Sequence, residues 1–135
     1  MTVADPIDRR VVERLLTRIR PFVVRYCRAK LSTSPDDVAR EVCLAVLTAL
    51  PGIREKRTPL LAFVYGIAAA TVASARGKPA EPAFLRGLPV GQREILLLRV
   101  AVGLSTEETA HAVGSTPNAV RVAQHRALAA LRAHP

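Results

Sequence analysis

The sequence has few of the residues on which metal sites and catalytic centres depend. It contains no tryptophan, two cysteines and three histidines among 135 residues. Cys27 and Cys43 lie in apolar helical patterns without a histidine nearby, which favours buried packing over a disulfide or a zinc site. His111, His125 and His134 share no helix face with paired carboxylates, and no phosphate loop or nucleophile elbow is present. These absences predict that the chain is not an enzyme and holds no metal or cofactor.

The chain also lacks a long uncharged segment. Its N-terminus carries charges within ten residues, which argues against a secretory signal. The longest uncharged run, residues 58–75, is short for a bilayer and contains Gly66, Thr71 and Ser74. We therefore expect a buried core helix in that run, and a cytoplasmic protein without membrane contact.

Acidic residues are scarce beside basic ones, with 11 Asp and Glu against 20 Lys and Arg, so the net charge is +9. Such an excess predicts a polyanionic partner, either nucleic acid or an anionic membrane surface. Most of it lies before Gly87, with an arginine-rich stretch between Arg9 and Arg28. Aromatic residues make up only 4% of the chain, so the core must consist of Ala, Val, Leu and Ile.

Helix signals follow one another along the whole chain, and no stretch shows strand alternation. Prolines suit first helical turns, and Asp8, Ser34, Ser105 and Thr116 suit the N-cap positions that precede them. Residues 51–52 should end one helix before a basic loop at 53–58, and residues 76–81 form the only plausible linker. The expected helices cover residues 9–19, 21–31, 35–50, 59–75, 82–87, 89–102, 106–113 and 117 onward.

The clearest motif lies between residues 106 and 126, directly after Ser105. Ser105 and Glu108 form a capping-box pattern. Ala110, Gly114 and Val120 then have the spacing of a helix-turn-helix, because a small residue lets the helices approach and glycine accepts a left-handed turn. A helical hairpin from a protein interface is the alternative, but the outer face is polar and basic. That face, at the spacing of a helix in a major groove, comprises Asn118, Arg121, Val122, His125 and Arg126.

Several segments resemble a known family. Leu-Pro at 88–89, Arg-Glu-Ile-Leu-Leu-Leu-Arg at 93–99 and Gly-Leu-Ser at 103–105 resemble region 4 of sigma-70 factors, which reads the −35 promoter element. Residues 37–44 resemble the region 2 helix that grips the β′ clamp helices of RNA polymerase, and residues 63–68 the start of the helix facing the −10 element. The chain is thus identified as a member of the extracytoplasmic-function sigma factors, closest to their sigma-D-like actinobacterial branch.

The resemblance implies an all-α fold of two small helical domains joined by an unusually short linker. Residues 1–76 would form the region 2 bundle, 77–81 the linker and 82–135 the region 4 helix-turn-helix domain. The implied partners are promoter DNA and core RNA polymerase, through its β′ clamp helices and β flap, with an anti-sigma factor as a further candidate. Polymerase contacts are expected from one stripe, for which a solvated helix face is the alternative: Asp37, Arg40, Glu41 and Leu44.

The resemblance also assigns residues to the two promoter elements. Asn118, Arg121 and His125, beside Val122, are expected at base edges of the −35 element. Arg126 and the helix amides capped by Ser105 and Thr116 are expected at phosphates. For Arg121 a phosphate contact is the alternative, and for Tyr65 a role in the core. The residues expected near the −10 element are Arg54, Lys56, Arg57, Tyr65, Ala70 and Ser74.

Two features depart from the family pattern. The −10-facing helix usually carries an Asn and an Asp where this chain has Ala70 and Ser74, so backbone approach and the preceding loop would supply the selectivity. The linker is also short, since six residues extend only about 20 Å at roughly 3.3–3.6 Å each. Most relatives have a longer segment that passes through the polymerase cleft. We therefore predict that the domains connect directly, or that helix ends melt to lengthen the linker.

Two other classes of protein remain as alternatives. A stand-alone regulator of the LuxR type has a very similar C-terminal pattern, but it does not need the helix at 37–44. A protein that binds anionic membranes would explain the charge, but not the discrete helix caps or the spacing of Ala110, Gly114 and Val120. Binding to core polymerase separates these alternatives from a sigma factor.

Overall fold

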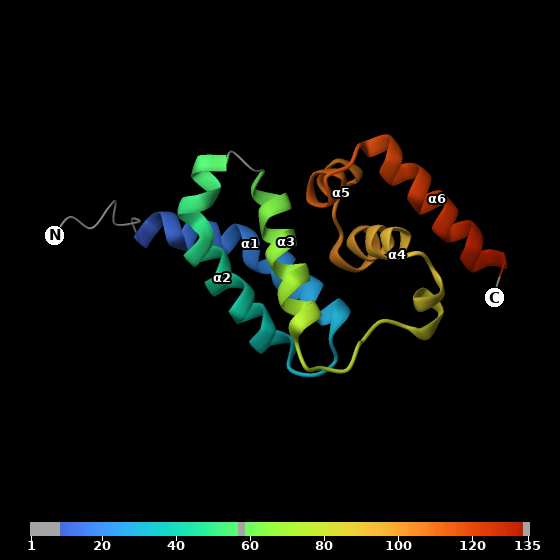
Figure 1. Ribbon diagram of the computed structural model, residues 1–135, viewed down its shortest axis with the longest axis horizontal. Helices are drawn as coiled ribbons and strands as arrows, with labels where there is room; N and C mark the ends of the chain where they lie inside the picture. The colour runs from blue at the N-terminus through green and yellow to red at the C-terminus, as the bar shows by residue number, and fades with distance from the viewer. Residues whose placement is uncertain (1–8, 57–58, 134–135) are drawn as a thin grey trace.

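The protein is built from helices arranged in two halves. The computed structural model describes residues 9–56 and 59–133, with only the backbone of 51–56. Figure 1 shows α1, α2 and α3 in one half and α4, α5 and α6 in the other, with α5 beside α3. No strand occurs in the part described, so the predicted all-α fold is confirmed. The elements are α1 (Arg9–Lys30), α2 (Pro35–Lys56), α3 (Leu60–Ser74), η1 (Ala83–Gly87), α4 (Val90–Leu97), η2 (Leu98–Val102), α5 (Thr106–Val113) and α6 (Pro117–Ala133).

Two predicted helix boundaries were wrong, both at prolines. Helix α1 runs without a break through Pro21, where two helices were expected. The proline side chain faces solvent, while Ile19, Phe22 and Tyr26 continue one buried stripe on either side of it. Burial of that stripe offsets the roughly 3 kcal/mol that an interior proline costs. Helix α2 likewise continues past Pro51 to Lys56, where a loop was expected.

The other helix boundaries agree closely with the prediction. Pro59 directly precedes α3, and a short 3-10 helix covers 83–87. The helix that begins at Val90 ends in a π-helical turn, η2, which Gly103 stops with a left-handed φ of 84°. The predicted cap Asp8 lies outside the described residues. Within those residues, no helix combines the length and the apolar character needed to cross a membrane.

A single hydrophobic cluster joins the two halves. Val23, Val42 and Val64 of the N-terminal half are fully buried in it, together with Leu98 and Val102 of the C-terminal half. Contacts between α3 and α5, and between α1 and η2, build this shared core. Two smaller clusters hold the C-terminal half together internally: Leu88, Leu96 and Ala127, and Ile95, Ala110 and Val120.

The segment between α3 and η1, residues 75–82, lies along the turn between α1 and α2. The N–H of Ser32 donates to the carbonyl of Lys78 at 2.9 Å, and the N–H of Ala80 donates to the carbonyl of Lys30 at 3.0 Å. Leu31 and Pro79 thereby form an isolated antiparallel bridge. The predicted linker is therefore hydrogen-bonded to the N-terminal half rather than extended into solvent.

Both cysteines are free thiols, as their apolar surroundings predicted. Cys27 is fully buried and Cys43 half-buried. Burial raises the pKa of the Cys27 thiol to about 11. Because the thiolate is the reactive form, Cys27 is unreactive at neutral pH.

Candidate nucleic-acid interface

Helices α5 and α6 form the predicted helix-turn-helix. Gly114 ends α5 in a left-handed conformation, with φ 68° and ψ 39°, and its N–H donates to the carbonyl of Ala110. Ala110 and Val120 are buried against each other and Ile95, so a small residue does allow the close approach of the two helices. The backbone geometry predicted from the spacing is confirmed.

Both helices begin with a side-chain cap. The Ser105 hydroxyl accepts from the N–H of Glu108 at 3.0 Å, and the Glu108 carboxylate accepts from the N–H of Ser105 at 2.8 Å. Thr116 accepts from the N–H of Ala119 at 3.1 Å. Each cap satisfies one first-turn N–H, and other first-turn N–H groups have no intrahelical acceptor. Those groups and the positive end of the helix dipole suit a phosphate.

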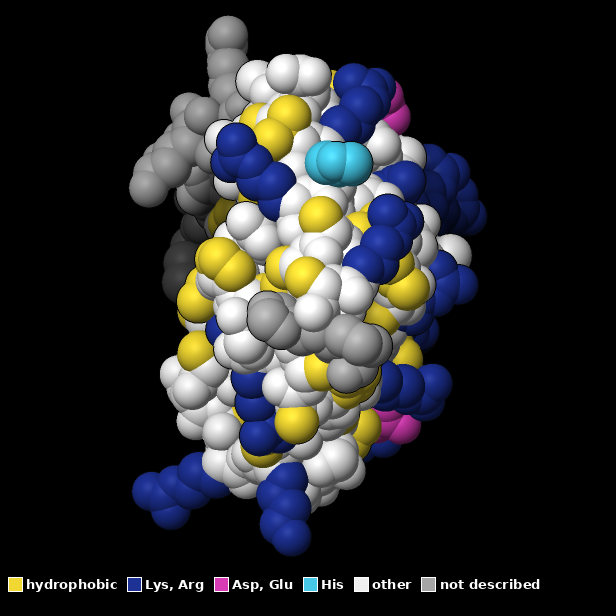
Figure 2. All heavy atoms as spheres, turned by 90° about the vertical axis from the view of Figure 1, so that its right-hand side faces the viewer, with side chains coloured by type: hydrophobic (Ala, Val, Ile, Leu, Met, Phe, Trp, Pro, Cys, Tyr) yellow, Lys and Arg dark blue, Asp and Glu magenta, His cyan; other side chains and the backbone are white. Residues whose placement is uncertain are grey.

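The outer face of α6 is exposed, as expected. Its buried side is formed by Val120 and Ala127. Figure 2 shows the side of the molecule that carries α6, where basic side chains dominate the charged groups and lie around a histidine and scattered apolar atoms. The five residues predicted to face DNA are all exposed: Asn118, Arg121, Val122, His125 and Arg126.

Two polar contacts hold the helix-turn-helix together. Arg99 donates from Nε to Oε1 of Gln124 at 3.1 Å and from Nη1 to the carbonyl of Leu104 at 2.6 Å, which ties η2 to α6 and to the start of α5.

On the outer face, Nη2 of Arg121 lies 3.9 Å from Oε1 of Glu107. Both of these side chains are more than 60% exposed, so the ion pair is weak and leaves the Arg121 side chain free to adopt other directions.

Replacing Gly114 by alanine is expected to destabilise the protein by about 1–2 kcal/mol, the cost of a left-handed conformation for a residue with a Cβ. Among the described residues, apart from the two chain neighbours of Gly114, no atom lies within 4 Å of the added methyl, so backbone strain accounts for the effect. Gly91, which is helical and has equally open surroundings, is the matched control. Gly91→Ala should stabilise by up to about 1 kcal/mol, since alanine favours helix. Urea unfolding measures both changes, and equal effects would contradict the argument.

The stripe predicted to contact polymerase lies on the exposed side of α2. Asp37, Arg40, Glu41 and Leu44 are all exposed, and Asp37 lies 3.6 Å from Arg40. Leu44 stands out because a leucine side chain is 64% exposed there. It borders a groove of about 410 Å³ between α1 and α2, lined by Leu16, Arg20, Val24, Arg28, Asp36, Ala39, Arg40, Cys43, Leu44 and Leu47.

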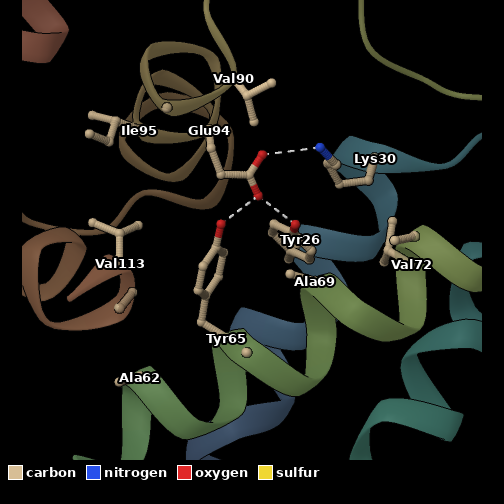
Figure 3. Close-up of a pocket in the computed structure, with 14 residues that line it drawn as sticks. Tyr26, Lys30, Ala62, Tyr65, Ala69, Val72, Val90, Glu94, Ile95 and Val113 are labelled. Atoms are coloured by element: carbon tan, nitrogen blue, oxygen red, sulfur yellow. Dashed lines mark hydrogen bonds and ion pairs between the residues drawn. The ribbon is translucent and has the colours of Figure 1, made fainter.

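The residues predicted near the −10 element do not share one face. Ala70 and Ser74 are exposed on α3 and line a shallow hollow with Glu41. Tyr65 instead points toward α4, into a cleft between the two halves (Figure 3). The side chains of Arg54 and Lys56, and the whole of Arg57, lie outside the described residues.

Our sequence analysis missed a polar cluster in that cleft, which we call the Glu94 cluster: Tyr26, Lys30, Tyr65, Glu81, Arg93 and Glu94. Oε1 of Glu94 accepts hydrogen bonds from Tyr26 at 2.5 Å and from Tyr65 at 2.8 Å, and its Oε2 lies 3.1 Å from Nζ of Lys30 (Figure 3). One feature of the sequence could have indicated that Glu94 is buried. It lies one helical turn before Leu98, which is fully buried on the same face of the helix.

Burial and charge both affect the ionisation of this cluster. Burial, followed by the negative charge of Glu94, raises the pKa of Tyr26 and of Tyr65 well above that of free tyrosine. Burial lowers the pKa of Lys30, but its contacts with Glu81 and Glu94 outweigh burial, and the net pKa is raised. Both hydroxyls and the ammonium group therefore stay protonated donors at neutral pH.

The C-terminal half matches a known domain. Residues 82–131 match the family model described as "Sigma-70, region 4". The chain is 49% identical to the ECF RNA polymerase sigma factor SigD of Mycobacterium tuberculosis, over 93% of this chain and 77% of that protein. It is 38% identical to the ECF RNA polymerase sigma factor ShbA of Streptomyces griseus, over 93% and 88%.

The fold is also that of a solved structure. CnrH, in its complex with the cytosolic domain of CnrY, superposes with a TM-score of 0.68 at 25% identity, over 94% of this chain and 88% of that one.

The alignment with SigD extends over 163 residues, at least 28 more than the 135 of this chain. The alignment must therefore pass over residues for which this chain has no counterpart.

Proposed function

This chain belongs to the extracytoplasmic-function (ECF) sigma factors of the sigma-70 family, on their SigD-like actinobacterial branch, and we propose from that premise how its two halves share the work. As a sigma factor it binds core RNA polymerase and directs promoter recognition and transcription initiation. Sigma factors are initiation factors rather than enzymes. The work of the protein is accordingly binding, and we expect it in the cytoplasm with the polymerase.

The C-terminal half reads the −35 element. The exposed outer face of α6 carries this proposal, because its polar and basic side chains stand opposite a buried side that fixes the helix on α5. Asn118, Arg121 and His125 reach base edges in the major groove. Arg126 and the capped helix starts at Ser105 and Thr116 meet phosphates and set the register.

The N-terminal half docks on polymerase and acts at the −10 element. Leu44, together with Asp37, Arg40 and Glu41, contacts the β′ clamp helices; an exposed leucine between charged groups is a suitable anchor for a protein interface. Ala70 and Ser74 are small, so the backbone of α3 approaches DNA closely at these two residues. Tyr65 becomes part of the same DNA-facing surface when α3 is not packed against α4. The β flap is proposed to meet the C-terminal half.

An anti-sigma factor is a further proposed partner. The structural relative CnrH was solved with the cytosolic domain of CnrY bound to it. The groove between α1 and α2 is lined by apolar side chains, by Arg20, Arg28 and Arg40, and by Asp36, which pairs with Arg28. The remaining positive charge favours a partner segment with apolar and acidic residues. Such a partner would compete with polymerase for the surface around Leu44.

Run-off transcription with core polymerase on a pool of genomic promoters tests the proposed function. We expect transcripts that depend on this chain and that start downstream of a shared pair of −35 and −10 sequences. Core polymerase alone serves as the control. Strong DNA binding without any start site would contradict the proposal and favour a stand-alone regulator.

A further inference from the structure

The positive charge of the N-terminal half is concentrated on one helix. Helix α1 carries seven arginines and one lysine against a single acidic residue, Glu13. Helix α2 is nearly balanced, with three basic and four acidic residues, and α3 contains no charged residue. Among the described helices of this half, α1 is therefore the one with the charge to attract a polyanion.

Three of these arginines form a row on the exposed side of α1, which we call the α1 arginine stripe: Arg10, Arg14 and Arg18. They are four residues apart, so they lie on one face of the helix with a rise of about 6 Å between neighbours. All three are exposed and border a shallow hollow together with Glu13 and Thr17. Arg14 and Arg18 make no hydrogen bond or ion pair with another residue that the structure describes. Their guanidinium groups can therefore bind an anion from outside the protein.

The stripe faces away from the surface proposed for polymerase. On α1, the groove beside α2 is bordered by Leu16 and Arg20. Two residues along an α-helix rotate the side-chain direction by about 200°, so Arg14 and Arg18 point to nearly the opposite side of α1. A partner that binds in the groove and around Leu44 would consequently leave the stripe uncovered.

The stripe also lies far from the surface proposed for the −35 element. Figure 1 shows the start of α1 at the opposite end of the molecule from α6. An anion bound by the stripe is therefore separate from the phosphates that Arg126 and the helix starts at Ser105 and Thr116 would meet. It belongs to the half of the protein that we propose acts at the −10 element.

The chemistry of the stripe suits a row of phosphates. Each position holds arginine rather than lysine, and a guanidinium group donates two parallel hydrogen bonds to a phosphate. One DNA strand carries a phosphate every 3.4 Å of helix axis, so the row of about 12 Å spans three to four of them. An anionic membrane is a poorer partner, because the apolar side of α1, with Phe22 and Tyr26, is buried in the core. An acidic protein segment offers carboxylates to the same groups, but the proposed function places this half on DNA.

We propose that the α1 arginine stripe binds backbone phosphates of the promoter duplex beside the −10 element, as a DNA contact separate from the base-reading surfaces. The proposal rests on the proposed function, which brings the N-terminal half to that element. Phosphate contacts carry no sequence information of their own. The stripe therefore strengthens the binding of polymerase to promoters in general and does not select among them, while α3, which is uncharged, contributes close backbone approach.

Removing two charges from the stripe provides the first test. Arg14→Gln combined with Arg18→Gln keeps the helix propensity and removes two exposed guanidinium groups. In complex with core polymerase, this stripe variant should bind every promoter with a log–log salt slope that is less steep by about 1.8, at about 0.9 per phosphate. Arg76→Gln with Lys78→Gln is the matched control, because it removes two exposed charges from the segment beside the other end of α1. The control should keep the wild-type slope, and a wild-type slope in the stripe variant would overturn the proposal.

Neutral phosphates provide the second test. Methylphosphonate linkages, introduced one at a time on either side of the −10 element, should weaken promoter binding by the wild type at a few positions. The same linkages should have no effect on the stripe variant, which has already lost the contact. If every linkage affected both proteins alike, the stripe would not touch the DNA backbone.

Two further measurements separate the possible failures. A stripe variant that binds core polymerase more weakly, but whose complex binds promoter DNA as before, would identify an acidic protein surface as the partner and contradict the proposal. Run-off transcription by the wild type is measured on the same promoter. Without transcripts the proposed function fails and the phosphate contact with it, whereas transcription with an unchanged salt slope in the stripe variant overturns the phosphate contact alone.

Discussion

Replacing Arg121 by alanine is expected to reduce promoter-specific transcription by about 5- to 150-fold, while core polymerase binds as before. The physical reason is the loss of one bidentate arginine–guanine contact, which is worth about 1–3 kcal/mol of discrimination. Arg121 is exposed on the outer face of α6, and the contact it makes within the described part of the chain is a 3.9 Å ion pair with Glu107, so its removal leaves the fold intact. Run-off transcription and a polymerase pull-down measure the two activities separately.

The salt dependence of DNA binding identifies the kind of contact that Arg121 makes. A lost phosphate contact lowers affinity on all sequences alike and reduces the log–log salt slope by about 0.9. A lost base contact instead relaxes specificity at one position of the −35 element. Arg132→Ala is the matched control, because Arg132 lies on the same side of α6, about 16 Å further along the helix axis. An equal loss in both variants would show that only the total charge matters.

Replacing Leu44 by aspartate is expected to weaken the binding of core polymerase by at least about 30-fold, the effect of losing a central anchor of a protein interface. The side chain is 64% exposed, so the substitution leaves the core of the N-terminal half unchanged. The charge would be buried against polymerase without a partner, which adds to the loss. DNA binding by α6 should not change.

Val100 offers the matched control for Leu44. It is an apolar side chain that is 73% exposed, and it lies in η2, outside the proposed polymerase stripe. Val100→Asp should therefore keep the affinity for polymerase within about twofold, as most surface substitutions do. Comparing Leu44→Asp and Val100→Asp with Arg121→Ala distinguishes a loss of polymerase binding from a loss of DNA recognition. If Leu44→Asp transcribed normally, the exposed stripe on α2 would be no more than a solvated face.

Local patterns in the sequence predicted the helix-turn-helix in detail. Ser105 with Glu108, and Gly114 with its left-handed φ, are determined by backbone hydrogen bonds and sterics within a few residues. The exposed and buried sides of α6 follow from the 3.6-residue period in the same way. Prolines were the exception, since Pro21 and Pro51 lie inside helices that packing elsewhere maintains.

By itself, the sequence determined the all-helical class, the caps at Ser105 and Thr116, the turn at Gly114 and the family. The predicted cap at Ser34 was wrong, since Ser34 has a left-handed φ of 48°. Each correct prediction depends on residues close together along the chain or on the order of motifs. Only the tertiary structure showed that the halves share one core and that Glu94 of α4 meets Tyr26, Lys30 and Tyr65. Contacts between residues 29 to 68 positions apart are not encoded in any local period. These contacts form where the surfaces of the two halves pack against each other. Each of those surfaces combines residues from several helices, so no single motif in the sequence describes it.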